Sequence, residues 1–338
     1  MVSKIFLVFL SFVLSYLYTY FKSRKQKISD IIYICLILVF VVFFSFRSYF
    51  FENIGTDYYE YKTWFEYINF STLPLKFSNI AFNLLICISK SIFNNFIFFL
   101  ICCSLIMNIC IFSFIKNNSK DFVLSTLIYT CLLFLSSFNV LRQWLACAVF
   151  LYAFKYIINK NFKKYFLLII VASLFHTSAI ILILLYPVLN VKIGFIKKEI
   201  IIILFGLIVF LNSNSFIFSI LTNSSVLGGD YLEKYSEYSV GIGNYTNFLI
   251  TLLVLIVLNV RNLKKSFNRN DTKILVLLCI ATIMNYLATK TFVFNRISIY
   301  FLPSILLAMP ILTQMIKKDS RVVVKYILYF LLMVSLIY

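Results

Sequence analysis

The chain has 338 residues, of which 62% are hydrophobic and 13% charged, and its formal net charge is +19. A soluble globular protein is about 45–50% apolar and about 25% charged, so this composition excludes that class. It predicts an all-α, polytopic integral membrane protein in which residues 1–338 form a single transmembrane domain in the lipid bilayer. The positive charge does not indicate a nucleic-acid partner, because the basic residues cluster in short loops between apolar runs, as the positive-inside rule describes.

Apolar runs of transmembrane length recur along the whole chain, and they predict about 10 to 12 transmembrane helices. The first run, from Ile5 to Tyr20, lacks a basic leading segment and a small-residue cleavage site, so we expect a retained helix rather than a signal peptide. Two long polar segments, 47–78 and 213–245, are predicted to be outer loops. The predicted crossings are 4–20, 29–46, 95–115, 121–138, 141–158, 199–212, 246–260, 272–289, 297–316 and 322–338.

The apolar segment 165–190 is compatible with one crossing or with two shorter helices. As one crossing it would place the basic segments 192–198 and 261–269 outside, against the positive-inside rule. As a pair of short or tilted helices with its apex near His176, it leaves every basic loop on the cytoplasmic side, with most of the 31 lysines and arginines. We therefore expect a broken helix pair with His176 facing outward, and such broken elements are tolerated where they line a cavity.

A second ambiguous segment, 77–92, spaces its apolar residues as a helix does but carries Asn79, Asn83 and Lys90. If this segment crossed the membrane, every later loop would change sides. We therefore interpret it as an interfacial or re-entrant helix on the outer side. The architecture as a whole is expected to be GT-C-like.

Motifs for nucleotide binding and for hydrolysis are absent from the sequence, which has no GxSxG, HExxH, GxGxxG or P-loop pattern. The eight cysteines all lie in apolar segments, without metal-ligand spacing to a histidine. We expect these cysteines to pack between helices without disulfides, and we predict no metal or other cofactor. Any group transfer is therefore expected to use a donor other than ATP bound at such a loop.

His176 is the only histidine in the chain, and it lies within an apolar run. An ionisable side chain inside a membrane carries a cost, so it is a candidate for function. The alternative is a packed, hydrogen-bonded imidazole. The predicted topology collects further polar groups on the outer side: Arg47, Glu52, Asp57, Glu60, Glu66, Arg142, Gln143, Lys290, Asn295 and Arg296.

Arginine is informative in this group because it stays charged and its planar guanidinium binds phosphate through two hydrogen bonds. Arg142 and Arg296, together with His176, therefore suit an anionic ligand such as a lipid diphosphate. Arg47 is a weaker candidate for the same ligand. The alternative for Arg142 and Arg296 is snorkelling at helix ends.

Asp57 follows Gly55 and Thr56 and precedes Glu60 in the predicted outer loop. Asp57 and Glu60 could share a helix face and bind a metal ion. A turn that leads into an aromatic interfacial helix, with Asp57 near the N-cap, is at least as well supported. Trp64 and the tyrosines of this segment are interpreted as anchors at the membrane interface.

At these positions the chain resembles the EpsG family, a branch of the Wzy-type polysaccharide polymerases. The resemblance runs over most of the chain and depends on the order and spacing of short motifs. The matching residues are Phe46-Arg47, Gly55-Thr56-Asp57-Tyr58 with Tyr61, Leu141-Arg142-Gln143 with Ala146, Ala172, Phe175-His176, Ser178-Ala179, Arg296 and Tyr300-Phe301. The loop 213–245 departs from larger polymerases of this type, which carry arginines in outer loops, because its only cation is Lys234. No role is assigned to that loop.

The resemblance implies a multi-pass glycosyltransferase of the bacterial plasma membrane, with its active site facing the exterior, that polymerises capsule, O-antigen or exopolysaccharide. Its donor would be a growing glycan on undecaprenyl diphosphate, and its acceptor a new repeat unit on the same lipid carrier. A chain-length regulator protein is a further expected partner. Two rivals stay open: a membrane O-acyltransferase that modifies surface glycans, and a lipid-linked oligosaccharide flippase, which is not an enzyme.

For the polymerase we assign Arg142 and Arg296 to the diphosphate as electrostatic stabilisers, with Gln143 in the same substrate-binding group. His176 is assigned as the general base, because imidazole titrates near neutral pH. Asp57 either orients the acceptor or serves as the base instead.

Overall fold

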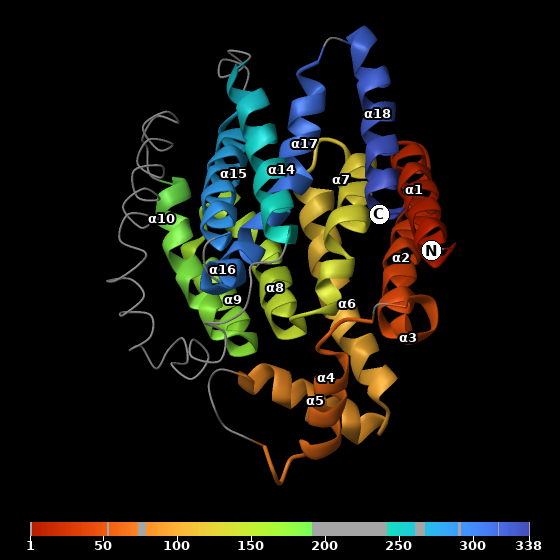
Figure 1. Ribbon diagram of the computed structural model, residues 1–338, viewed down its shortest axis with the longest axis vertical. Coiled ribbons are helices and arrows are strands. Elements are labelled where there is room, and N and C mark those ends of the chain that lie inside the picture. The colour runs from red at the N-terminus through yellow and green to blue at the C-terminus, as the bar shows by residue number, and fades with distance from the viewer. Residues whose placement is uncertain are drawn as a thin grey trace.

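The computed structural model describes residues 2–52, 54–73, 79–190, 242–260, 268–289, 292–316 and 318–337. Within these ranges the structure is a bundle of helices without a β-strand (Figure 1), which confirms the predicted all-α fold. The predicted crossing 199–212 and the basic segment 192–198 lie outside the described residues, and of the outer loop 213–245 only the last four residues are described. The helices are α1 (Val2–Lys22), α2 (Gln26–Ser45), α3 (Arg47–Phe50), α4 (Tyr58–Tyr67), α5 (Ile80–Ile92), α6 (Phe96–Asn118), α7 (Phe122–Ile128), a π turn η2 (Tyr129–Leu133), a 3₁₀ turn η3 (Leu135–Phe138), α8 (Leu141–Ile158), α9 (Phe162–Phe175), η4 (Thr177–Leu184), α10 (Leu185–Asn190), α14 (Ile242–Val260), α15 (Arg269–Ala288), α16 (Phe292–Phe301), η6 (Leu302–Ser304), α17 (Ile305–Gln314) and α18 (Lys318–Ile337).

Six helical segments among the described residues are long and apolar enough to cross a membrane, by length and composition. They are Val2–Lys22, Gln26–Ser45, Phe96–Asn118, Leu141–Ile158, Arg269–Ala288 and Phe294–Gln314. Shorter apolar helices are Ile80–Ile92, Phe122–Leu133, Thr177–Asn190 and Gly243–Leu258. Each predicted crossing within the described residues coincides with one of these segments or with α18, so the chain is a multi-pass membrane protein.

The segment 165–190 forms a broken pair of helices, as predicted from the charge of the loops. α9 leads away from the end of α8, and η4 and α10 lead back. The Lys273 ammonium binds both the Ile157 carbonyl oxygen (2.8 Å) and Asn190 Oδ1 (2.9 Å). Because one ammonium reaches both residues, the end of α10 lies at the same level as the end of α8. The break at His176 must therefore lie toward the opposite end of the bundle.

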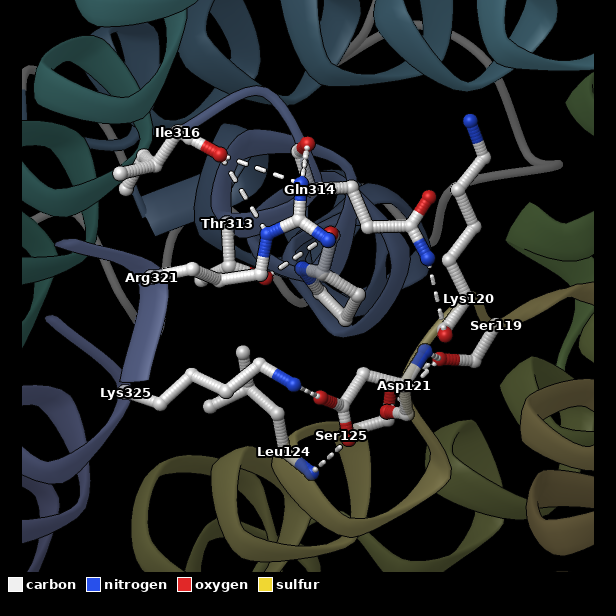
Figure 2. Close-up of polar contacts among 11 residues, drawn as sticks. Ser119, Lys120, Asp121, Leu124, Ser125, Thr313, Gln314, Ile316, Arg321 and Lys325 are labelled. Atoms are coloured by element: carbon white, nitrogen blue, oxygen red, sulfur yellow. Dashed lines mark hydrogen bonds and ion pairs between the residues drawn. The ribbon is translucent and has the colours of Figure 1, made fainter. Parts of the chain in front are cut away.

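We call the end of the bundle at which α17 leads into α18 the basic end; it is at the top of Figure 1. Ion pairs join segments that are distant in sequence at this end: Lys120 pairs with Asp271 at 2.5 Å, and Lys325 pairs with Asp121. Figure 2 shows the second pair together with Arg321, which donates to the carbonyl oxygens that end α17. Three predicted basic loops thus lie at one end of the molecule, as the positive-inside rule requires.

The opposite end, which we call the His176 end, carries α4 and α5 at the bottom of Figure 1. α5 has 13 residues and is therefore about 20 Å long, too short for a hydrocarbon core of about 30 Å. Lys90 near its end donates to the Phe65 and Glu66 carbonyl oxygens (3.0 and 2.8 Å) at the end of α4. This geometry agrees with an interfacial helix over the described part of 77–92.

The predicted crossing 121–138 is not one regular helix. α7 passes into the π turn η2, in which the Phe134 amide donates to the Tyr129 carbonyl oxygen (2.8 Å), and then into η3. The chain turns at Asn139 and Val140 before α8 begins. α8 is buried on nearly every side, so the direction of this turn decides where the first residues of a central helix lie.

The two ends can be assigned to the two sides of the membrane by labelling. Thr177→Cys, next to the break, is expected to react with a membrane-impermeant maleimide added from outside, because the positive-inside rule puts the basic end in the cytoplasm. Asn159→Cys, at the exposed end of α8, is the matched control and should react only after permeabilisation. The parent chain with its eight cysteines gives the background. Labelling of Thr177→Cys from the cytoplasmic side alone would reverse the assignment.

Candidate functional site

His176 lies at the junction of α9 and η4. Its amide still donates to the Ala172 carbonyl oxygen (3.1 Å), as in a helix, but its backbone is extended, with φ −154° and ψ 117°. Its own carbonyl oxygen then accepts from the Ala179 amide (3.0 Å), which begins the 3₁₀ turn. The two helices therefore meet at the histidine, and its half-buried ring is held at the apex of the broken pair.

Two hydroxyl groups fix the His176 ring. Nδ1 lies 2.8 Å from Ser178 Oγ, and Ser178 Oγ lies 2.9 Å from the Tyr300 hydroxyl, which is itself 3.4 Å from Nδ1. With the proton on Nδ1, the ring donates to Ser178 and leaves the Nε2 lone pair available as a base. Among the described residues Nε2 makes no hydrogen bond. Ser178 and Tyr300 belong to the motifs that resemble the EpsG family, but sequence reasoning assigned neither of them to the site.

Arg142 stands in the first turn of α8 and is held by the two outer helices. Its Nη1 donates to Asn79 Oδ1 at 2.7 Å, and its guanidinium stacks on the Trp64 ring, 4.4 Å from the centroid. Its Nε is buried without a hydrogen-bond partner. Arg142 is half-buried, and a guanidinium that is fixed on one side and partly open is suited to an anionic ligand.

Gln143 joins α8 to α16. Its Nε2 donates to the Arg296 carbonyl oxygen, and one turn later Cys147 Sγ lies 3.5 Å from the Ile299 carbonyl oxygen. The structure therefore brings three sequence-predicted residues from separate parts of the chain to one region. Gln143, next to Arg142, bonds the Arg296 carbonyl oxygen, and Tyr300, one turn after Arg296 on α16, contacts the His176 ring.

Arg47 is fully buried, at 0% exposure. Its guanidinium stacks against the rings of Phe44, Tyr58 and Phe138, at 4.7, 5.0 and 5.1 Å from their centroids. Its three side-chain nitrogens make no hydrogen bond. Burial of this kind leaves no face of the guanidinium open to a bulky diphosphate in this structure, although the three aromatic faces offset part of its desolvation.

Asp57 is the residue before α4, but its side chain does not cap that helix. Instead Oδ2 accepts from the Val140 amide (2.9 Å), and Oδ1 accepts from the Thr56 hydroxyl (2.9 Å). Within the described residues no three His, Cys, Asp or Glu side chains form a group that could hold a metal ion.

The family model described as the EpsG family matches residues 36–338, a range that contains every residue of this site. No curated protein and no solved structure matches the chain.

Proposed function

The chain belongs to the EpsG family, and from this membership we propose that it is a Wzy-type polysaccharide polymerase. It joins repeat units carried on undecaprenyl diphosphate, at the outer leaflet of a bacterial plasma membrane, to make capsule, O-antigen or exopolysaccharide. The observation that carries the proposal is that α8 and α16 bring Arg142 and Arg296 toward a fixed His176 at the end of the bundle opposite the basic loops. A chain-length regulator protein is a further proposed partner.

The reaction follows from the chemistry of these side chains. A hydroxyl of the acceptor sugar attacks the anomeric carbon of the donor, and a new C–O bond forms. The bond from that carbon to the diphosphate oxygen breaks, and its electron pair leaves with the lipid diphosphate. Nε2 of His176 takes the hydroxyl proton, while Arg142 and Arg296 stabilise the charge that develops on the leaving diphosphate.

Tyr300 and Ser178 support the assignment of His176 as the base. With the proton on Nδ1, the ring donates to Ser178 Oγ, the Ser178 hydroxyl can donate to Tyr300, and the Nε2 lone pair stays free. The two outer helices would also contribute, because Asn79 and Trp64 hold the Arg142 guanidinium in place.

Deletion of the gene in the producing bacterium tests the function as a whole. We expect loss of surface polymer and accumulation of single lipid-linked repeat units on the outer leaflet, because export of each unit continues without polymerisation. Plasmid-borne wild-type protein should restore the polymer. Polymer of normal length that lacks an acyl group would indicate an acyltransferase instead, and repeat units retained on the inner leaflet would indicate a flippase.

A further inference from the structure

The turn before α8 is strained at Val140. This residue has φ 46° and ψ 43°, in the left-handed region, which a β-branched side chain rarely adopts. Its carbonyl oxygen accepts the first hydrogen bonds of α8, from the Gln143 and Trp144 amides (2.9 and 3.1 Å). Such a conformation persists only where the surroundings hold it, so some contact must fix Val140 in place.

The outer loop supplies that contact over three consecutive residues. The Asp57 carboxylate accepts the Val140 amide proton at 2.9 Å, a charge-assisted bond. The Thr56 amide donates to Asn139 Oδ1 at 2.7 Å. Gly55 has φ +94°, and a Cβ there would lie 2.7 Å from the Phe138 carbonyl oxygen. Residues 55–57 are thus fitted closely against residues 138–140, and we call this contact the loop lock.

Arg47 packs against both sides of the loop lock from the protein interior. Its buried guanidinium lies between the rings of Tyr58, next to Asp57, and Phe138, at the other side of the lock. The Asp57 charge also acts on Arg47. Burial of a guanidinium without a hydrogen bond costs desolvation free energy. Here the guanidinium lies between the two chain segments that the loop lock joins.

We infer that Asp57 is a positioning residue that acts through Val140 on the first turn of α8, and that Arg47 and Gly55 serve the same lock. The expected effect on polymer formation depends on the proposed function. Arg142 and Gln143 directly follow the turn, and their side chains reach α5 and α16 at the His176 site. With both carboxylate oxygens of Asp57 occupied, the loop lock sets where α8 begins and thereby where the Arg142 guanidinium lies.

Substitutions of Asp57 and of Val140 distinguish a positioning role of Asp57 from a direct role in proton transfer. Asp57→Ala removes the acceptor for the Val140 amide and should lower the rate of polymer formation about tenfold or more. Asp57→Asn keeps an acceptor oxygen and should retain most of the rate, which a residue that takes a proton could not do. Val140→Gly adopts the left-handed conformation without strain, so it should restore most of the rate to Asp57→Ala while changing the parent little.

Trp64 provides a readout that does not depend on polymerase activity. Arg142 stacks on this ring, and Trp144 is the only other tryptophan. In a Trp144→Phe background in lipid nanodiscs, Asp57→Ala should change the emission spectrum of Trp64 and its quenching by iodide, and Val140→Gly should reverse the change. If the deletion experiment excludes a polymerase, the Trp64 signal still tests the lock alone.

Two results would overturn the inference. Equal loss of polymer in Asp57→Ala and Asp57→Asn, without rescue by Val140→Gly and without a change at Trp64, would place Asp57 in the chemistry. Unchanged polymer and an unchanged Trp64 signal in Asp57→Ala would show that the lock does not position α8.

If the Asp57→Ala protein does not accumulate, Asp57→Asn alone decides the question. An active Asp57→Asn variant supports the positioning role. An inactive Asp57→Asn variant with the parental Trp64 signal contradicts it. His176→Ala with Val140→Gly is the matched control and should stay inactive.

Discussion

Replacement of His176 by alanine is expected to stop polymer formation, with lipid-linked single repeat units accumulating and the protein present at the parental level. Removal of a general base costs about 10²–10⁴-fold in rate, enough to abolish visible polymer. The measurement is polymer length on gels, together with the ratio of lipid-linked single units to polymer.

Two neighbouring substitutions serve as controls for His176. Thr177→Val is nearly isosteric and lies at the same break, and the Thr177 side chain makes no hydrogen bond among the described residues, so the parental rate is expected. Tyr300→Phe keeps the buried ring but removes the hydroxyl near Nδ1; it should cost less than His176→Ala. Parental polymer lengths in His176→Ala would exclude the histidine as the base.

Replacement of Arg142 is expected to have the second large effect, and lysine is as informative as alanine. Loss of one donor that stabilises developing negative charge costs about 10²–10³-fold in rate. Lysine keeps the charge but lacks the planar fork that binds a diphosphate through two hydrogen bonds. We therefore expect Arg142→Lys to lose most of the polymerisation rate, as Arg142→Ala does, when membranes are supplied with lipid-linked repeat units.

The lysine variant also separates substrate binding from snorkelling. A lysine snorkels to the membrane surface as well as an arginine does, so an active Arg142→Lys would favour that alternative. Arg296→Ala should resemble Arg142→Ala, and the double variant should be less than additive because both cations serve one diphosphate. Arg321→Ala removes an arginine at the basic end, where it binds the carbonyl oxygens of Gln314 and Ile316, and should leave the polymerisation rate unchanged.

The multi-pass helical fold and the broken helix pair were predictable because the features that indicate them add up along the chain. Apolar length predicts a crossing, and the sign of loop charge predicts its direction, without knowledge of any distant contact. This reasoning placed His176 at the apex of a broken pair, and the shared contacts of Lys273 with Ile157 and Asn190 agree with it. The same reasoning brought Arg142 and Arg296 to the His176 end.

Other features depend on pairs of residues that are far apart in sequence, and no local pattern identifies them. The sequence offers Asp57 as a base, a metal ligand or a helix cap, and only the fold shows that its partner is the amide of Val140, 83 positions away. A backbone amide carries no signature in the sequence, and neither does the positive φ of Val140. Asn139, which accepts the Thr56 amide, was missed for the same reason.

The environment of Arg47 was likewise not predictable from the charge pattern of the sequence. From the sequence it is one more outward arginine at a helix end, and an arginine near the membrane surface is normally expected to reach water. The tertiary structure instead encloses it among Phe44, Tyr58 and Phe138, which come from three separate segments. Composition and charge along the chain thus determined that this protein crosses the membrane many times and which groups share one side. Only the packing of distant segments decided that Arg142 and Gln143 connect to α5 and α16 while Asp57 and Arg47 pack at the turn before α8, because burial and hydrogen-bond partners arise between segments rather than within them.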